Sequence, residues 1–423
     1  AKLPPSVHMN PVLLKPETDT GAQVIVRGQR MGTLRAKNFL DKKRDLLPLV
    51  LESFAHLARE ADIVLVEGAG SPAEINLREG DIANMGFAIA ADVPVVLAGD
   101  IDRGGVIAAL VGTRAVLDPD DAAMIRGFII NKFRGDPELF SEGYRQIEAL
   151  SGWRGYGVVP WLRATAHLPS EDAVVLERTA RETAGRLKIA CPIIPRIANF
   201  DDLDPIKAES SVELVMVPPG QPIPGDCALI VLPGSKATIA DMKAMREQGW
   251  DIDILAHHRR GGKVLGICGG YQMLGRRIAD PEGIEGPPED IPGLGLLDVE
   301  TVLTGDKALR QVAGTALDQA FTGFEMHMGV TSGPDCRHPF ALLGEGRPDG
   351  ATSADRQVTG TYVHGAFAST ALRSALLGML GAQSDGIDHD AKVDDALNAI
   401  AAELEHHLDV DGLLKLAMGK DDA

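Results

Sequence analysis

One cysteine of this chain, Cys268, lies among glycines in the pattern Gly266-Ile267-Cys268-Gly269-Gly270. The pattern G-x-C-x-G is typical of a nucleophile elbow, where a strand turns sharply into a helix and small residues let the backbones pass. Such a turn exposes the sulfur beside a helix N-terminus, whose partial positive charge favours the reactive thiolate. A lone cysteine can also be a small buried hydrophobe, but the flanking glycines and the apolar run before them favour a nucleophile.

A thiolate nucleophile needs a histidine base and donors that stabilise the oxyanion of the reaction. His364 follows the apolar run 360–363, and a base at that strand end would face the elbow. His327 is the alternative base, although its position also fits a structural histidine or one that shapes the substrate site. The backbone N–H of Gly269 and a second donor from the turn at Gly234 are predicted to form the oxyanion site.

Apolar runs that alternate with helical patterns should position these residues. In the first half the runs are residues 63–66, 93–98 and 127–130, and a helical pattern covers residues 45–59. In the second half the runs are residues 187–194, 229–232, 263–267 and 360–363, and the tail 394–418 is mostly helical. Runs that are apolar throughout predict parallel sheets covered by helices on both faces, and ligands bind such sheets at the carboxyl ends of the strands.

The pattern weakens over residues 161–186, where the charged residues leave no clean apolar face. We therefore predict two α/β domains, at residues 1–165 and 187–423, joined by a linker at residues 166–186. A chain of 423 residues is long enough to build a separate core in each half.

The composition argues against several classes of protein. The net charge of −18 does not suit a protein that binds the nucleic-acid backbone. The four cysteines form no C-x-x-C pair, which argues against a zinc knuckle, and their small number fits a reducing cytoplasm. The longest apolar run, residues 87–99, is broken by Asp92 and Pro94, and the N-terminus has no signal pattern. We therefore expect a cytoplasmic protein that binds neither nucleic acid nor membrane.

Longer motifs resemble the cobyric acid synthase family along nearly the whole chain. In the second half they are PGSK at 233–236, GICGGYQMLG at 266–275 and TYVHG at 361–365. In the first half they are MNPVLLKP at 9–16, VEGAGSPAEINL at 66–77, DIDRGGV at 100–106 and IINKFRGD at 129–136. The motifs are long and follow the order of the family, so the chain is identified as a member of it.

The resemblance implies two domains with different chemistry. The first resembles the parallel-sheet domain of P-loop NTPases and dethiobiotin synthetase, and the second a class I glutamine amidotransferase domain with a flavodoxin-like α/β fold. Enzymes of the family convert adenosylcobyrinic acid a,c-diamide into adenosylcobyric acid in cobalamin biosynthesis by amidating the b, d, e and g carboxylates. The amidotransferase domain would release ammonia from glutamine through a thioester on Cys268. The synthetase domain would use ATP and Mg²⁺ to activate each carboxylate as an acyl phosphate.

The resemblance also implies roles for polar residues of the first half. Glu67 would be a Mg²⁺ ligand, and Asn131 with Lys132 would bind the nucleotide. The alternatives are a solvent-facing glutamate before a glycine turn and an ordinary loop after a strand. Four further residues are expected on the substrate side, although Arg103 fits a structural salt bridge equally well. These four are Glu74, Asn76, Asp102 and Arg103.

Two features depart from the patterns of related enzymes. Many class I amidotransferases carry a glutamate two residues after the histidine, and here that position is Ala366. The cobyric acid synthase branch is similar in lacking this glutamate, and the sequence assigns no third partner to His364. The family also opens with a phosphate loop, G-x-x-x-x-G-K-[ST], which this sequence lacks. Its two Gly-Lys pairs, at 262–263 and 419–420, precede neither Ser nor Thr.

The first family motif already begins at residue 9, which predicts a chain truncated at its N-terminus. Such a chain would lack the first strand and the phosphate loop, so we expect it to hydrolyse glutamine without forming amides. Two other hypotheses are a cobyrinic acid a,c-diamide synthase, which has the same architecture, and an inactive relic. The motifs at 9–16 and 100–106 favour cobyric acid synthesis over the first, and the presence of Cys268 and His364 opposes the second.

Overall fold

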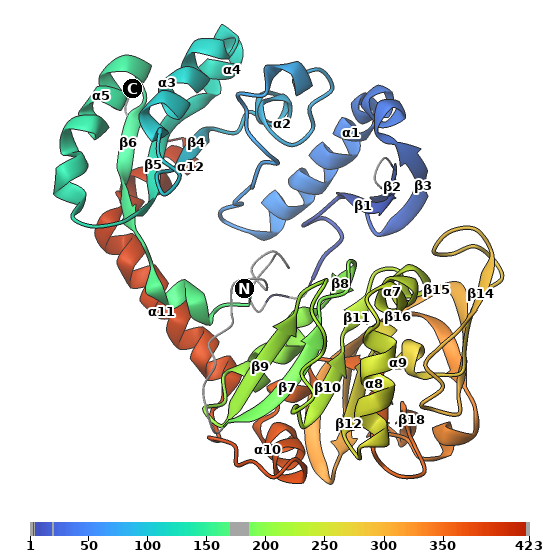
Figure 1. The fold of residues 1–423 in the computed structure, drawn as a ribbon. Helices are drawn as coiled ribbons and strands as arrows, with labels where there is room; N and C mark the ends of the chain where they lie inside the picture. The colour runs from blue at the N-terminus through green and yellow to red at the C-terminus, as the bar shows by residue number, and fades with distance from the viewer. Residues whose placement is uncertain (1–2, 4, 19–20, 170–185, 420–423) are drawn as a thin grey trace. The chain divides into compact units, whose positions relative to one another are not determined.

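A computed structural model of the chain describes residues 3, 5–18, 21–169 and 186–419 (Figure 1). The chain forms two compact units, one of residues 1–165 with 397–423 and one of residues 166–396. The predicted linker at residues 166–186 lies largely outside the described residues. The predicted second domain, 187–423, differs from this division because the segment after residue 396 belongs to the first unit.

The first unit begins with a small antiparallel sheet and a long helix. Strands β1 (Val12–Thr18), β2 (Gly21–Val26) and β3 (Gln29–Arg35) pair in that order, and helix α1 (Ala36–Glu60) follows. Its helical pattern from residue 45 onward was predicted, but the helix begins nine residues earlier. That first part of α1 follows β3 directly, without an intervening loop.

A parallel sheet forms the rest of the first unit. Its elements are α2 (Met85–Ala91), β4 (Val95–Asp100), α3 (Val106–Val116), α4 (Pro119–Met124), β5 (Ile125–Phe133), α5 (Ser141–Ser151) and β6 (Arg154–Pro160). The strands pair in the order β4–β5–β6, and Figure 1 shows α3 and α5 beside them. Phe128 and Ile130 on β5 are fully buried against side chains of both helices. The predicted strands at 93–98 and 127–130 are confirmed.

The strand predicted at residues 63–66 is wrong. Within the part of the chain that the structure describes, this run pairs with no other strand, and the sheet begins at β4 instead. A strand needs a neighbour to satisfy its backbone N–H and C=O groups, and local β propensity does not supply one. The side chain of Leu65 is 93% exposed, so the apolar pattern of this run does not mark a buried strand here.

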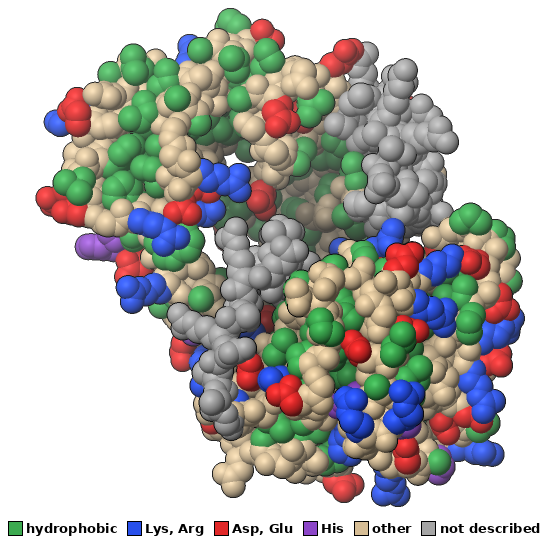
Figure 2. Space-filling model, viewed as in Figure 1, with side chains coloured by type: hydrophobic (Ala, Val, Ile, Leu, Met, Phe, Trp, Pro, Cys, Tyr) green, Lys and Arg blue, Asp and Glu red, His purple; other side chains and the backbone are tan. Residues whose placement is uncertain are grey.

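The segment from residue 397 onward, which begins within helix α11 (His389–His407), completes the first unit. Helix α11 leads to helix α12 (Val410–Ala417), as the helical tail predicted. Between them Asp409 donates its backbone N–H to the carbonyl of Tyr156 at 2.8 Å, on strand β6. Hydrophobic side chains gather on the surface of this unit over α3 and α5 (Figure 2), where Ile107, Phe140 and Leu150 line a shallow apolar groove.

The second unit contains a six-stranded, mostly parallel sheet. Its strands, in spatial order, are β19 (Ala351–Thr352), β20 (Val358–Thr361), β12 (Lys263–Ile267), β10 (Leu229–Leu232), β7 (Leu187–Pro192) and β9 (Val212–Val217). Only β19 runs antiparallel to its neighbour. The four apolar runs predicted in this half fall on β7, β10, β12 and β20.

Both faces of this sheet are buried, as predicted from apolar runs that contain no alternating polar residues. On β10, Ile230 and Leu232 belong to one core cluster, while Leu229 and Val231 belong to the other. Helices α7 (Thr238–Glu247), α8 (Trp250–Arg259) and α9 (Gly269–Leu274) supply side chains to the first cluster, and α10 (Thr370–Met379) supplies the second. The strand ends that carry polar residues are therefore held from both sides.

A second, largely antiparallel sheet extends the unit. It contains β13 (Arg277–Asp280), β14 (Glu289–Pro292), the long strands β15 (Glu300–Ala316) and β16 (Gln319–Ser332), and β21 (Val363–His364). Short strands β17 (Ala341–Leu343) and β18 (Arg347–Asp349) pair beside β15. Strand β21 follows β20 after one residue, so the two sheets meet next to His364. No helix among the described residues is long and apolar enough to cross a membrane.

Candidate active site

Cys268 occupies a strained turn between β12 and α9. Its backbone has φ 53° and ψ −109°, a conformation that residues with a side chain rarely adopt. The Cys268 N–H donates to the carbonyl of Thr361 at 2.8 Å, on the adjacent strand β20. The predicted strand-to-helix turn is therefore present, and its strained residue is the cysteine itself.

The glycines around Cys268 are required by close packing. A Cβ at Gly266 would lie 2.6 Å from the carbonyl oxygen of Gly270, and one at Gly270 would lie 2.1 Å from that of Leu232. A Cβ at Gly269 would lie 2.8 Å from the backbone nitrogen of Ser235. The beginning of helix α9 is thus pressed against the turn 233–235, which brings together the two segments predicted to supply oxyanion donors.

His364 lies at the end of β21 with a side chain only 1% exposed. The Phe324 ring stacks on its imidazole with ring centroids 5.3 Å apart. A Cβ at Gly234 would lie 3.1 Å from Cε1 of the same imidazole. The structure therefore brings His364, Gly234 and the Cys268 elbow into one site, as the sequence predicted.

A carboxylate that the sequence did not single out contacts this histidine. Asp202 accepts a hydrogen bond from Nδ1 of His364 through Oδ2 at 2.7 Å, and the backbone N–H of Gly365 donates to its Oδ1 at 2.6 Å. Asp202 lies in the short helix η5 (Phe200–Leu203), which follows strand β8 (Ile197–Ala198). The acidic run after residue 200 was the one available signal, but it precedes His364 by 162 residues.

The surroundings of His364 favour its protonated form. Burial alone would lower the pKa of His364, but the hydrogen bond to Asp202 and the charges of Asp202 and Cys268 outweigh burial and raise this pKa to about 10. Among the described residues, Nε2 of His364 has no hydrogen-bond partner although it is buried. Sγ of Cys268 lies 3.3 Å from the carbonyl oxygen of Met326, to which a thiol can donate. Nε2 is therefore the atom available for proton exchange with the sulfur.

The alternative base, His327, has different surroundings. Its ring stacks on that of Tyr362 with centroids 3.8 Å apart, and burial lowers its pKa. It lies on β16 one residue after Met326, so it borders the same site. Glu325 on this strand accepts from Arg310 and Arg347 rather than from His327. This environment fits a neutral histidine that shapes the site.

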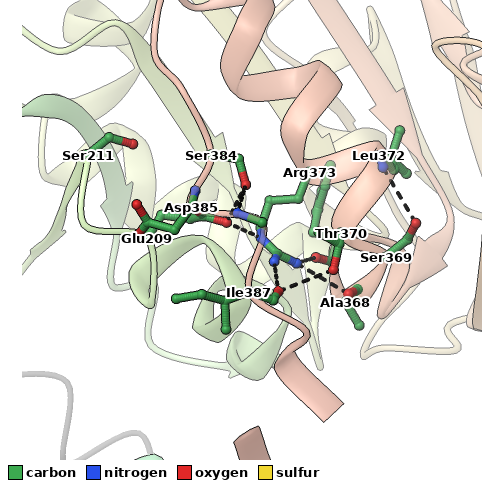
Figure 3. A network of polar contacts seen from close by, with 12 residues as sticks. Glu209, Ser211, Ala368, Ser369, Thr370, Leu372, Arg373, Ser384, Asp385 and Ile387 are labelled. Carbon is green, nitrogen blue, oxygen red and sulfur yellow. Dashed lines mark hydrogen bonds and ion pairs between the residues drawn. The ribbon is translucent and has the colours of Figure 1, made fainter. Parts of the chain in front are cut away.

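A buried ion pair supports the segment that follows His364. Figure 3 shows the guanidinium of Arg373, on α10, between Glu209 and backbone carbonyls. Nε of Arg373 is 2.5 Å from Oε1 of Glu209, and both side chains are only 1% exposed. Arg373 also donates to the carbonyls of Phe367 and Ala368, in the short helix that begins two residues after His364. Glu209 closely follows η5, so this pair joins the segments that carry Asp202 and His364.

Four of the predicted residues of the first unit, Asp102, Arg103, Asn131 and Lys132, lie at the carboxyl ends of β4 and β5. Nζ of Lys132 is 2.7 Å from Asp100, whose pKa is lowered chiefly by that hydrogen bond. Asp102 pairs with Arg134 at 2.6 Å, and the Asn131 side chain accepts from the Lys132 N–H. Arg103 has an exposed side chain, as do the predicted residues Glu67, Glu74 and Asn76.

The described residues do not by themselves form a metal site. Nowhere among them do three or more His, Cys, Asp or Glu side chains come together in a way that could hold an ion. Glu67 and Asp100 carry oxygen ligands of the kind that Mg²⁺ prefers, but one is solvent-exposed and the other is paired with Lys132. We therefore assign no chemical step to a metal.

Comparison with known proteins defines the class of this molecule. Residues 188–372 match the model of the CobB/CobQ-like glutamine amidotransferase domain, and residues 33–167 match that of an AAA domain. The first match contains the elbow, His364 and Asp202. The chain is thus a glutamine amidotransferase joined to an ATPase-type domain, in agreement with the predicted fold class.

Curated relatives identify the family. A cobyric acid synthase of Rhizorhabdus wittichii is 66% identical over 98% of this chain and 86% of its own length. One of Novosphingobium aromaticivorans is 63% identical over 99% of this chain and 85% of its own length. The chain belongs to the cobyric acid synthase family, whose members are glutamine-hydrolysing ligases. The alternatives of a diamide synthase and an inactive relic are not favoured.

Proposed function

We propose that this chain amidates the b, d, e and g carboxylates of adenosylcobyrinic acid a,c-diamide to give adenosylcobyric acid, with glutamine as the nitrogen donor and ATP as the energy source. The observation that carries this proposal is the strained Cys268 elbow beside the buried His364 in a chain with the family's motifs from end to end. The relatives named cobyric acid synthase support the choice of substrate.

Glutamine hydrolysis would begin when the Cys268 thiol gives its proton to Nε2 of His364. The thiolate then attacks the side-chain amide carbon, and the carbonyl oxygen takes up the electron pair as an oxyanion. We place the backbone N–H groups of Gly234 and Gly269 opposite this oxyanion, because the packing of α9 against the turn 233–235 brings these segments together.

Collapse of the tetrahedral intermediate breaks the carbon–nitrogen bond. His364 returns its proton to the departing nitrogen, so ammonia leaves and a thioester remains on Cys268. A water molecule then attacks the thioester while His364 accepts one of its protons. The carbon–sulfur bond breaks, glutamate leaves, and the proton returns to the sulfur.

The first unit would consume this ammonia. A carboxylate at neutral pH is a poor electrophile, so its oxygen first attacks the γ-phosphorus of ATP, which releases ADP and leaves an acyl phosphate. Ammonia displaces the phosphate and forms the amide. Asn131 and Lys132 are proposed to bind the nucleotide, since both lie at the carboxyl end of β5.

Two further assignments in the first unit remain proposals. Glu67 is the carboxylate we propose for Mg²⁺, because the motif that contains it, at residues 66–77, resembles that of the family. The substrate side of the unit would include polar residues that lie outside the core. These residues are Glu74, Asn76, Asp102 and Arg103.

Mass spectrometry of the corrinoid tests the proposal. The chain is incubated with adenosylcobyrinic acid a,c-diamide, ATP, MgCl₂ and either glutamine or ammonium chloride. We expect four new amides with either donor, and release of glutamate with glutamine. Glutamate release without any amide from either donor would overturn the synthetic role and leave only glutamine hydrolysis. Omission of ATP is the matched control and should abolish amide formation alone.

A further inference from the structure

We propose that Asp202 is the positioning residue of His364, and that it takes in space the place of the glutamate that many class I amidotransferases carry two residues after the histidine. The proposal rests on the proposed glutamine hydrolysis by Cys268 and His364. Under this proposal the third partner of His364 comes from a different segment of the chain. Ala366 occupies the sequence position that the glutamate has in those enzymes.

Asp202 holds both the side chain and the backbone at His364. One carboxylate oxygen accepts from Nδ1 at 2.7 Å, and the other accepts from the Gly365 N–H at 2.6 Å. The first contact fixes the proton on Nδ1, which directs the lone pair of neutral imidazole to Nε2. The second fixes the peptide that follows the histidine, so the ring can neither rotate nor shift without breaking a charged hydrogen bond.

The carboxylate of Asp202 is buried and hydrogen-bonded at the end of strand β21. Its side chain is 6% exposed, and it accepts hydrogen bonds from His364 and Gly365. Phe200 and Leu203, at the two ends of η5, are buried and anchor the helix in the core. The carboxylate is therefore placed to stabilise the imidazolium that forms when Nε2 receives the thiol proton.

The buried pair of Arg373 and Glu209 fixes the distance between the two segments. Glu209 closely follows the helix of Asp202, and Arg373 donates to the carbonyls of Phe367 and Ala368 just beyond His364. Figure 3 shows the Arg373 side chain between Glu209 and Ala368. Glu209 also accepts from the Asp385 N–H at 2.6 Å. These contacts link the segment that follows η5 to the segment that follows β21.

The neighbouring Asp201 offers a matched control. It lies in the same short helix and interacts electrostatically with His364, but its side chain is exposed and, among the described residues, it forms no hydrogen bond with the imidazole. The charged and titratable groups around His364 are then Asp201 and Asp202 from η5, Cys268 from the elbow and His327 from β16. If the pH profile of the reaction changed when Asp202 was replaced but not when Asp201 was replaced, the role of Asp202 would be separated from those of the other groups.

Glutaminase kinetics of Asp202→Asn, Asp202→Glu and Asp201→Asn test the assignment. Asparagine preserves size but cannot stabilise the imidazolium, so we expect kcat to fall by about 100-fold or more with KM changed only a few-fold. Asp202→Glu should recover part of this loss, and Asp201→Asn should resemble the wild type. Wild-type kcat in Asp202→Asn would overturn the proposal.

Alkylation of Cys268 by iodoacetamide gives a readout that needs no turnover. The rate follows the thiolate, which protonated His364 stabilises, so the rate profile of Asp202→Asn should shift to higher pH. Subtracting the rate of Cys268→Ser removes the other cysteines. An unshifted profile would contradict the role of Asp202. A wild type without glutaminase activity would instead count against the proposed function, while the profile would still decide the role of Asp202.

A measurement on the wild-type protein guards against variants that do not fold. Nitrogen-15 NMR reports which ring nitrogen of His364 carries a proton, with the signals assigned by their loss in His364→Gln. The proposal requires a proton on Nδ1 at every pH where the protein is folded. A wild-type spectrum in which Nδ1 lacks its proton would overturn it.

Discussion

Arg373 and Glu209 form an ion pair in which both side chains are 1% exposed, and the guanidinium is shared with three backbone carbonyls. A buried ion pair of this kind contributes little to the free energy of unfolding compared with a well-packed apolar pair. The loss of one partner, however, leaves the charge of the other buried and uncompensated. The pair joins the segments that carry Asp202 and His364, so its integrity should matter for both stability and activity.

We therefore predict that Arg373→Met lowers the free energy of unfolding of the second unit by about 3–5 kcal/mol, because Glu209 is left buried and unpaired. Urea denaturation followed by tryptophan fluorescence measures the change, since Trp250 is buried in this unit. The double variant Arg373→Met/Glu209→Met should be more stable than Arg373→Met alone. If it were less stable, the unpaired charge would not be the cause.

Replacement of Cys268 by alanine should abolish glutamine hydrolysis, since no other group on the elbow can form the thioester. We expect a loss of at least about 10³-fold in kcat, measured as glutamate release. Amide synthesis from ammonium chloride should persist, because it bypasses the thioester. Cys336→Ala is the control: this cysteine contacts the Tyr271 hydroxyl and lies outside the elbow, so its loss should leave turnover close to that of the wild type.

The pKa of His364 predicts how the stability of the second unit depends on pH. In the folded protein this pKa is raised to about 10, whereas an unfolded histidine titrates near 6.5. The folded state therefore binds the extra proton between these values, and stability contributed by His364 is complete below about pH 6.5 and is lost as pH rises through about 10. Urea denaturation at a series of pH values measures this decline. His364→Gln should lack it, and an equal decline in that variant would show another group to be responsible.

The glycine before the elbow should not tolerate even one added carbon. In Gly266→Ala the new Cβ would lie 2.6 Å from the Gly270 carbonyl oxygen and from Cδ1 of Leu274. We expect about 1–3 kcal/mol of destabilisation and a fall in glutaminase activity, because the strained turn at Cys268 must shift. At Gly286 a Cβ would meet no atom within 4 Å, so Gly286→Ala should change neither quantity. Similar losses in both variants would contradict the packing argument.

Lys132→Met tests the nucleotide role in the first unit. If Lys132 binds phosphate, removal of a charged hydrogen bond should weaken ATP binding by about tenfold or more, as measured by isothermal calorimetry. Its ion pair with Asp100 is half exposed, so stability should change by less than about 1 kcal/mol. Lys243→Met removes a pair of similar exposure in the second unit and should leave ATP binding unaltered. If Lys132→Met and Lys243→Met bound ATP with equal affinity, Lys132 would not be part of the nucleotide site.

The sequence was sufficient where local chemistry decides the structure. The elbow was predictable because glycines on both sides of Cys268 are needed for close backbone packing, and that requirement is visible in five consecutive residues. Strands β7, β10, β12 and β20 were predictable because each is buried on both faces and carries no polar alternation. His364 followed from its place at the end of such a strand.

The sequence was insufficient where partners come from distant segments. The contact between Asp202 and His364 spans 162 residues, and no spacing rule connects them. The run at 63–66 has strand propensity, but pairing decides whether a strand forms, and here it has no partner among the described residues. The last helix, α12, belongs to the first unit although it follows the second in sequence, which composition alone could not indicate.

The separation of Asp202 from His364 has a consequence for how such enzymes are compared. A glutamate two residues after the histidine belongs to the same short sequence motif, so an alignment of that motif also detects the acid. Here the acid is encoded before the nucleophile, and the order along the chain is Asp202, Cys268, His364. A survey confined to the neighbourhood of the histidine would count this protein among enzymes without a third residue. Its evolutionary history can be traced only by following two distant positions together.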